Sequence, residues 1–177
     1  MAHIGNRQHA RVILDWHNDN WGNEDGYSPD EWEIVGSGSF RTAYLHIPTN
    51  VVYKVEDGSW QGYGSAQELR VAQSLRKNRT FKKVRIPLTS GFRFHDGLVL
   101  AMEAVKGESI GMFEDTRKAR AGRLELFKVG FEDMHPQNFF IEPGGVVVPV
   151  DMASPIGRKN PDRRLLNGLL EKDTVRV

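Results

Sequence analysis

The sequence contains no cysteine among its 177 residues. This absence excludes a disulfide-stabilised scaffold, a thiolate zinc site and a cysteine nucleophile at the same time. It also fits a protein that works in a reducing compartment.

An excess of charge of one sign is lacking too. The chain has 24 Lys and Arg against 23 Asp and Glu, a formal net charge of +1. This balance argues against nucleic acid or an anionic membrane as a partner held by bulk charge. The basic runs at 76–79, 82–85 and 117–123 are interpreted as solvated faces, with a nucleic-acid-binding stripe as the alternative.

Long apolar runs are missing. The longest candidates, 97–102 and 146–150, are strand-sized and fall far short of the ~20 residues that a membrane helix needs. The first eleven residues lack the apolar centre of a secretory signal. We therefore expect a soluble, cytoplasmic protein.

Enough apolar material is present for a small globular protein. Hydrophobic residues make up 39% of the chain and aromatic residues 10%. A chain of this length buries roughly 70% of its unfolded surface. It supports one domain, or two small lobes that share a cleft.

Short strands with tight turns dominate the first half. Strand patterns occur at 32–35, 40–47 and 51–55 and favour an antiparallel sheet. Before a loop at 18–29, residues 7–16 predict a short helix with Val12, Ile13 and Trp16 facing inward. Trp16 and Trp21 lead us to expect that this N-terminal segment docks on the sheet.

The rest of the chain alternates between helix and strand patterns. Residues 65–76 predict a helix with Ala66, Leu69, Ala72 and Leu75 on one face. The remaining predicted elements are strands at 91–94 and 98–102, a helix at 117–127, a loop at 130–137, strands at 139–141 and 146–150, and a helix or ordered tail at 158–170.

Three polar residues form the clearest candidate site. Asp133 and Asn138 lie five positions apart in one loop (138 − 133), and Asp151 ends an apolar strand. Carboxylate and amide oxygens aimed at one point suit Mg²⁺, and a second Asp nearby can accept a proton from an attacking hydroxyl. Taken singly, Asp133 and Asn138 can also be turn formers, and Asp151 can be a strand-end cap.

The pattern Asp133-x-His135-Pro136-x-Asn138, followed by Asp151, resembles the catalytic and metal-binding loops of the protein-kinase-like superfamily. The His-Pro form is similar to that of aminoglycoside and choline kinases. The resemblance implies that Asp133 orients or deprotonates the acceptor hydroxyl, and that Asn138 and Asp151 hold the metal ions on the ATP phosphates. It implies that His135 supports the transferred phosphate.

The first half resembles the same family. The segment Gly36-Ser37-Gly38-Ser39 is similar to the kinase glycine-rich loop, whose backbone amides approach phosphate oxygens; a plain hairpin turn is the alternative. Lys54 stands where the family has the lysine that contacts the α- and β-phosphates, and Glu68 where it has the glutamate that pairs with that lysine. By themselves, Lys54 can be an exposed strand-end residue and Glu68 a solvated helix residue.

Residues 98–107 resemble the last strand and the hinge of a kinase N-lobe. Met102 would lie at the back of the adenine pocket, and the backbone of Glu103 to Val105 would face the adenine edge. The matching features follow the family's order from residue 34 to residue 151.

The resemblance implies an α+β, protein-kinase-like bilobal fold, with an antiparallel five-stranded N-lobe carrying one helix and a strongly reduced helical C-lobe. We expect an N-terminal extension at 1–30, an N-lobe with the glycine-rich loop and hinge at 31–105, and a truncated C-lobe with the catalytic and metal-binding loops at 106–177. Only 26 residues follow Asp151 (177 − 151), as in the short kinase-like proteins of bacteria and phages.

Some positions depart from the family pattern. Arg41 replaces the third glycine of the loop, Glu132 stands before Asp133 where many protein kinases have Arg, and Met152-Ala153 follow Asp151 in place of Phe-Gly. Arg41 brings a bulky cation near the expected phosphate site.

The expected function is an ATP- and Mg²⁺-dependent phosphotransferase. Its first expected acceptor is a Ser or Thr hydroxyl of a protein, including this protein itself, and the second is a small hydroxylated molecule. The alternative is a nucleotide-binding pseudokinase or scaffold that acts through a protein partner or as a homodimer. Arg41 and the short C-lobe motivate it, because missing helices would leave an apolar surface uncovered.

Overall fold

The computed structural model describes residues 3–20, 29–38, 40–57, 63–109, 119–131 and 135–152. The chain forms two compact units. Unit 1 contains Met1–Lys77 and Ile86–Val105, and unit 2 contains Asn78–Arg85 and Lys106–Val177. The helix or tail expected at 158–170 lies outside the described residues.

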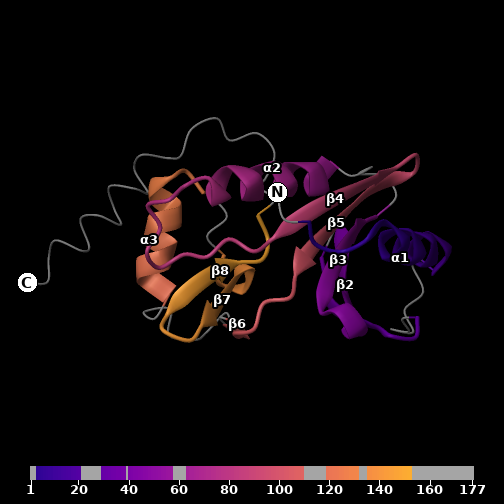
Figure 1. The fold of residues 1–177 in the computed structure, drawn as a ribbon, viewed down its shortest axis with the longest axis horizontal. Helices are drawn as coiled ribbons and strands as arrows, with labels where there is room; N and C mark the ends of the chain where they lie inside the picture. Colours follow the sequence, from indigo (N-terminus) through magenta and orange to yellow (C-terminus); the bar gives the residue numbers. More distant parts are fainter. Residues whose placement is uncertain are drawn as a thin grey trace, which may run out of the picture. The chain divides into compact units, whose positions relative to one another are not determined.

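A five-stranded antiparallel sheet forms the centre of unit 1 (Figure 1). The strands run in the spatial order β1-β2-β3-β5-β4. Their bounds are β1 Trp32–Ser37, β2 Arg41–His46, β3 Val51–Glu56, β4 Thr89–Phe94 and β5 Gly97–Glu103, with a single 3₁₀ turn, η1 Ile47–Thr49, between β2 and β3. The predicted α+β class and five-stranded antiparallel sheet are confirmed.

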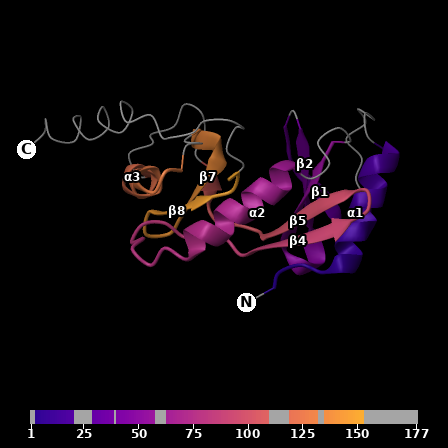
Figure 2. The same cartoon turned by 90° about the horizontal axis from the view of Figure 1, so that it is seen from above.

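Two helices cover opposite faces of this sheet, α1 (Arg7–Asn20) and α2 (Tyr63–Arg76), and Figure 2 shows β4 and β5 between them. Side chains alternate between the two faces of a strand, so Tyr53 and Val55 pack in the core with α1 while Lys54 points to α2. Every residue of β3 is buried. The central strand is therefore covered on both sides, and its two charged residues, Lys54 and Glu56, are buried together with its apolar ones.

The inward face of α1 differs from the prediction. Ile13 is fully buried as expected, but Val12 is 46% exposed and Trp16 is only half-buried. The buried residues of the helix are Ala10, Ile13, Leu14 and His17. Their i, i+3, i+4, i+7 spacing is that of a helix stripe facing a sheet, and the sequence prediction failed because His17 was not counted as an inward residue.

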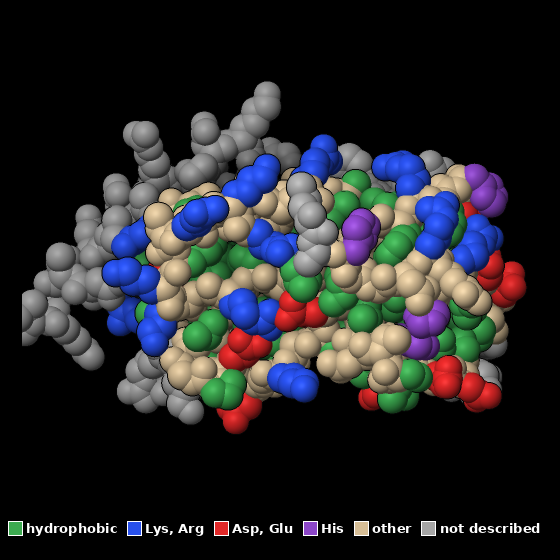
Figure 3. Space-filling view, in the orientation of Figure 1, with side chains coloured by type: hydrophobic (Ala, Val, Ile, Leu, Met, Phe, Trp, Pro, Cys, Tyr) green, Lys and Arg blue, Asp and Glu red, His purple; other side chains and the backbone are tan. Residues whose placement is uncertain are grey.

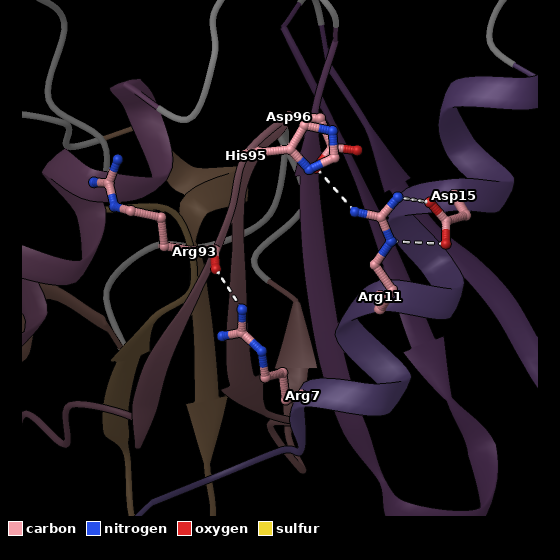
Figure 4. A network of polar contacts seen from close by, with 6 residues as sticks. All are labelled: Arg7, Arg11, Asp15, Arg93, His95 and Asp96. Carbon is pink, nitrogen blue, oxygen red and sulfur yellow. Dashed lines mark hydrogen bonds and ion pairs between the residues drawn. The ribbon is translucent and has the colours of Figure 1, made fainter.

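Two arginines of α1 form polar contacts with the hairpin of β4 and β5 (Figure 4). Arg11 bonds Asp15 on its own helix and Asp96 in the hairpin turn, where Nη1 lies 3.0 Å from Oδ1. Arg7 donates to the carbonyl oxygen of Arg93 at 2.9 Å. The N-terminal helix is thus joined to the sheet by polar contacts at its rim as well as by its buried stripe.

Unit 2 is built on a three-stranded sheet in the order β6-β7-β8. Its elements are β6 Glu108–Ser109, α3 Arg120–Lys128, η3 Pro136–Asn138, β7 Phe139–Glu142 and β8 Val146–Pro149. Residues 78–85 join this sheet, because Val84 forms a parallel bridge with Val147 and Val147 donates to the carbonyl oxygen of Lys83 at 2.9 Å. Gly122 of α3 packs directly on this strap, where a Cβ would lie 2.5 Å from the Lys83 oxygen.

No helix in the described part of the chain is long and apolar enough to cross a membrane. Figure 3 shows lysine and arginine side chains distributed over one face of the molecule, with acidic side chains among them.

Candidate functional site

A buried ion pair joins the centre of the sheet to α2 in unit 1. Lys54 Nζ lies 2.7 Å from Glu68 Oε1, and the two side chains are 7% and 0% exposed. Lys54 is therefore not an exposed strand-end residue, and Glu68 is not solvated. The buried stripe of α2 runs through Ser65, Glu68, Ala72 and Leu75, while Ala66 and Leu69 are half-buried. Counting only apolar residues had shifted the predicted face of this helix.

The glycine-bearing segment links β1 to β2. Gly36 pairs with Ala43 just beyond a bulge at Ile34–Gly36, and Ser37 pairs with Thr42. The amide of Gly38 donates to the carbonyl oxygen of Arg41 at 2.9 Å and so closes the turn. Ser39 lies outside the described residues.

Within the part of the chain that the structure describes, neither the backbone conformation nor the neighbouring atoms require glycine at position 36 or 38. The glycines with positive φ among the described residues are at positions 5, 130, 144 and 145. A Cβ would lie 3.8 Å from Ala43 Cβ at Gly36 and 3.7 Å from the Arg41 oxygen at Gly38. Both are ordinary van der Waals distances, so the hairpin itself would accept a side chain at either position.

Arg41 contributes to the buried pair as well. Its Nη1 lies 2.6 Å from Glu68 Oε2, and its side chain is 12% exposed. The sequence had marked Arg41 only as a departure from the glycine pattern. Strand register was the signal that could have found this contact, because positions 41 and 43 share a face and Ala43 lies opposite Lys54.

The expected hinge follows β5. Met102 is buried, and Glu103 forms two hydrogen bonds with Leu88, since its amide donates to the Leu88 carbonyl at 3.0 Å and its carboxylate accepts from the Leu88 amide at 2.8 Å. The amide of Ala104 donates to Asn50 at 3.3 Å. Among the described residues, the amide of the half-buried Val105 has no hydrogen-bond partner. It is therefore the available donor of the hinge.

Unit 2 holds the other predicted residues. Phe139 pairs with Pro149, and the Val150 amide donates to the Asn138 carbonyl at 2.8 Å. Asn138 and Asp151 therefore stand at the same end of the β7–β8 hairpin, and both are half-buried. The exposed His135 precedes them in the turn that leads into η3.

Asp133, the predicted base, lies outside the described residues, as do Glu132 and Met134. The described residues contain no group of three or more His, Cys, Asp and Glu side chains that could hold a metal ion. One carboxylate and one amide oxygen, at Asp151 and Asn138, fit the way in which Mg²⁺ is held by one or two protein oxygens together with substrate phosphates.

A second buried polar cluster, which the sequence did not predict, lies on the α1 face of the sheet. His17 Nδ1 lies 2.7 Å from the Tyr44 hydroxyl, and its Nε2 lies 3.1 Å from Asp57 Oδ1. Burial lowers the pKa of His17 below its usual range despite the nearby Asp57. Burial also raises the pKa of Tyr44 to about 12. This cluster belongs to the docking of α1, on the face opposite Lys54.

No protein-family model and no curated protein matches the chain. Similar solved structures include the GDP and kanamycin complex of APH(2'')-IIIa, with 21% identity, coverage of 64% of this chain and 39% of that chain, and a TM-score of 0.40. They also include two GDP complexes of aminoglycoside 2'-phosphotransferase-IIIa, one of a mutant and one of the wild type. The mutant has 22% identity, 68% and 39% coverage and a TM-score of 0.41. The wild type has 20% identity, 69% and 40% coverage and a TM-score of 0.41.

The chain spans 39–40% of the length of these similar structures.

Proposed function

We propose that this protein is a nucleotide-dependent phosphotransferase of the kinase type, and that Lys54 contacts the phosphates of the nucleotide. The observation that carries this proposal is the buried pair of Lys54 and Glu68 at 2.7 Å. A buried ion pair contributes little net stability, because the desolvation of two charges offsets their attraction. An anionic ligand therefore accounts for a buried lysine better than the needs of the fold do.

The two glycines support the same proposal. Gly36 and Gly38 have room for a Cβ, and neither has a positive φ. A backbone without Cβ atoms lets phosphate oxygens approach the amide groups closely. A bound triphosphate therefore accounts for glycine at positions where the hairpin would accept other residues.

The hinge supplies a donor for the base of the nucleotide. The amide of Val105 is available among the described residues, and the buried Met102 precedes it. An amide donor suits one edge of a purine, since the edge needs hydrogen bonds and the ring faces need apolar contacts.

For the transfer step we propose the residues that the resemblance to kinases assigned. The acceptor hydroxyl oxygen would attack the γ-phosphorus, the bond from that phosphorus to the β–γ bridging oxygen would break, and Asp133 would take the hydroxyl proton. Asn138 and Asp151 would hold Mg²⁺, which supplies positive charge to offset the phosphate oxygens. His135, exposed before η3, would donate to the transferred phosphate.

The acceptor is a hydroxyl group, from either a protein Ser or Thr or a small molecule. The test uses γ-labelled ATP and γ-labelled GTP with Mg²⁺, a generic Ser/Thr acceptor protein in one arm and kanamycin, the ligand in one similar structure, in another. Label on the protein itself, on the acceptor protein or on kanamycin identifies the acceptor class.

Variants decide whether the transfer belongs to this site. Lys54→Met and Asp151→Asn should each lower the rate by about 100-fold or more, the usual cost of losing one group that stabilises transition-state charge. Lys128→Met, at the exposed end of α3, is the matched control and should leave the rate unchanged. Nucleotide binding without transfer in any arm would contradict the phosphotransferase activity and indicate a nucleotide-binding scaffold. A wild type that binds no nucleotide would contradict both the phosphotransferase and the scaffold.

A further inference from the structure

Glu68 holds two cations at once, and they come from neighbouring strands. Its Oε1 contacts Lys54 of β3 at 2.7 Å, and its Oε2 contacts Arg41 of β2 at 2.6 Å. The carboxylate is fully buried, and the two cations are 7% and 12% exposed. Both oxygens of one buried carboxylate are therefore neutralised by separate residues.

The strand register places these side chains on one face of the sheet. Arg41 lies opposite Glu56, and Ala43 lies opposite Lys54. Since residues two apart along a strand share a face, Arg41, Lys54 and Glu56 all point toward α2. The carboxylate of Glu56 accepts from the backbone amide of Ser65 in the first turn of α2, where the helix dipole favours a negative charge.

The charge count shows what Arg41 adds. Lys54 and Glu68 alone sum to zero, so the pair by itself has no net attraction for an anion. With Arg41 the three side chains sum to +1, and the charge of Glu56 on the same face is partly offset by the Ser65 amide at the start of α2. A buried carboxylate that loses its partner is strongly destabilised, so a lysine that was the sole partner of Glu68 could not be shared with phosphates without cost.

We infer that Arg41 is a positioning residue for nucleotide binding. By neutralising Glu68 from β2, it allows the ammonium of Lys54 to be directed at the phosphates while Glu68 remains paired. The inference rests on the proposed function, in which Lys54 contacts the phosphates. It gives a role to the residue that replaces the third glycine of the loop pattern.

Two other roles for Arg41 make different predictions. If Arg41 had only a structural role in holding β2 against α2, its loss would affect the binding of adenosine and ATP alike, because both need a folded unit 1. A residue that contacts the phosphates itself would act independently of Glu68. The inferred role acts on phosphates only, and only through Glu68.

The first measurement compares ATP with adenosine by titration calorimetry. Arg41→Met should lower the ratio of ATP affinity to adenosine affinity by about tenfold or more, because Lys54 loses the second cation that shares the buried Glu68 carboxylate with it, while adenosine affinity stays within about twofold. Arg41→Lys should recover at least half of that loss on a logarithmic scale. Arg93→Met is the matched control, since its exposed side chain points away from Arg7 in Figure 4, and it should leave the ratio unchanged.

The second measurement repeats the comparison in a Glu68→Gln background. Once the carboxylate is neutral, adding Arg41→Met should change the ratio by less than about threefold. An undiminished tenfold loss in that background would overturn the inference in favour of direct phosphate contact. An unchanged ratio of ATP affinity to adenosine affinity in Arg41→Met would overturn it in favour of a purely structural role. If Arg41→Met does not fold, the Arg41→Lys variant and the double variant decide between the same outcomes.

Failure of the proposed function gives a different result. In that case the wild-type protein itself shows no preference for ATP over adenosine, before any variant is compared. A wild type that prefers ATP, with variants that keep this preference, would contradict only the role of Arg41.

Discussion

Alanine variants of the glycines in the β1–β2 turn distinguish an effect on folding stability from an effect on nucleotide binding. Alanine at Gly36 would place its Cβ 3.8 Å from Ala43 Cβ, and alanine at Gly38 would place its Cβ 3.7 Å from the Arg41 oxygen, without a positive φ at either position. Alanine at a compatible position restricts the unfolded chain and stabilises by about 0.4–1 kcal/mol. For a protein of this size that is a rise of roughly 1–4 °C in Tm.

Nucleotide binding should respond in the opposite direction. A methyl group at either position would hold a phosphate oxygen away from the backbone amides. Losing one hydrogen bond to a charged group costs about 1.5–3 kcal/mol, so affinity for ATP should fall by roughly tenfold to a hundredfold. The two alanine variants should therefore be slightly more stable and bind ATP clearly more weakly.

Scanning calorimetry without nucleotide and titration calorimetry with ATP measure the two effects separately. Gly5→Ala is the control, since its φ is +73° and a Cβ would lie 2.8 Å from Ala101 Cβ; it should lower stability by about 1–3 kcal/mol. The reasoning is refuted if Gly36→Ala and Gly38→Ala destabilise as much as this control and leave ATP affinity unchanged. The glycines would then serve the hairpin alone.

Three further predictions concern stability. Ile13→Ala, at a fully buried position of α1, should cost about 2–5 kcal/mol in urea denaturation, whereas its neighbour Val12→Ala, 46% exposed, should stay within about 0.5 kcal/mol. Burial lowers the pKa of His17 in the folded protein, so the unfolded chain binds the proton first. Stability should fall as the pH drops below about 6.5, by up to about 1.4 kcal/mol per pH unit, and His17→Gln should remove that part of the slope in thermal melts at pH 5–8. Gly122→Ala, with its Cβ 2.5 Å from the Lys83 oxygen, should lower Tm because a backbone carbonyl cannot move aside, at a cost of about 1–3 kcal/mol.

Each of these has a clear contrary result. Equal costs for Ile13→Ala and Val12→Ala would mean that α1 does not dock through its observed stripe. An unchanged pH slope in His17→Gln would mean that this imidazole is not held neutral by burial. A Gly122→Ala variant as stable as the wild type would mean that α3 and the strap at 78–85 are packed less closely than the structure has them.

Local patterns predicted most of the sheet of unit 1. The strand patterns at 51–55, 91–94 and 98–102 correspond to β3, β4 and β5. These elements are predictable because period, turn residues and burial all agree within a few residues of sequence. The same agreement fixed the β7–β8 hairpin, whose turn contains Gly144 and Gly145 at positive φ.

Polar residues that face inward could not be assigned from the sequence alone. His17 and Glu68 are buried because each finds a partner far along the chain, Tyr44 in one case and Lys54 in the other. A prediction from hydrophobic residues alone assigns such polar residues to the exposed face. The predicted buried faces of α1 and α2 were therefore rotated away from the observed ones. The resemblance to kinases placed Glu68 beside Lys54, but nothing in the sequence showed that Arg41 would share the same carboxylate.

The strap at 78–85 makes both units discontinuous. The chain leaves unit 1 after Lys77, contributes residues 78–85 to unit 2, returns at Ile86 and leaves again after Val105. Val84 pairs with Val147, which is 63 positions later (147 − 84), so during synthesis residues 78–85 can form this pairing only after β8 has been made. A single cut after Val105 would also separate residues 78–85 from β8, the strand with which Val84 pairs in the described part of the chain. Separate expression of unit 1 therefore needs a new connection that replaces residues 78–85, from the end of α2 directly to Ile86.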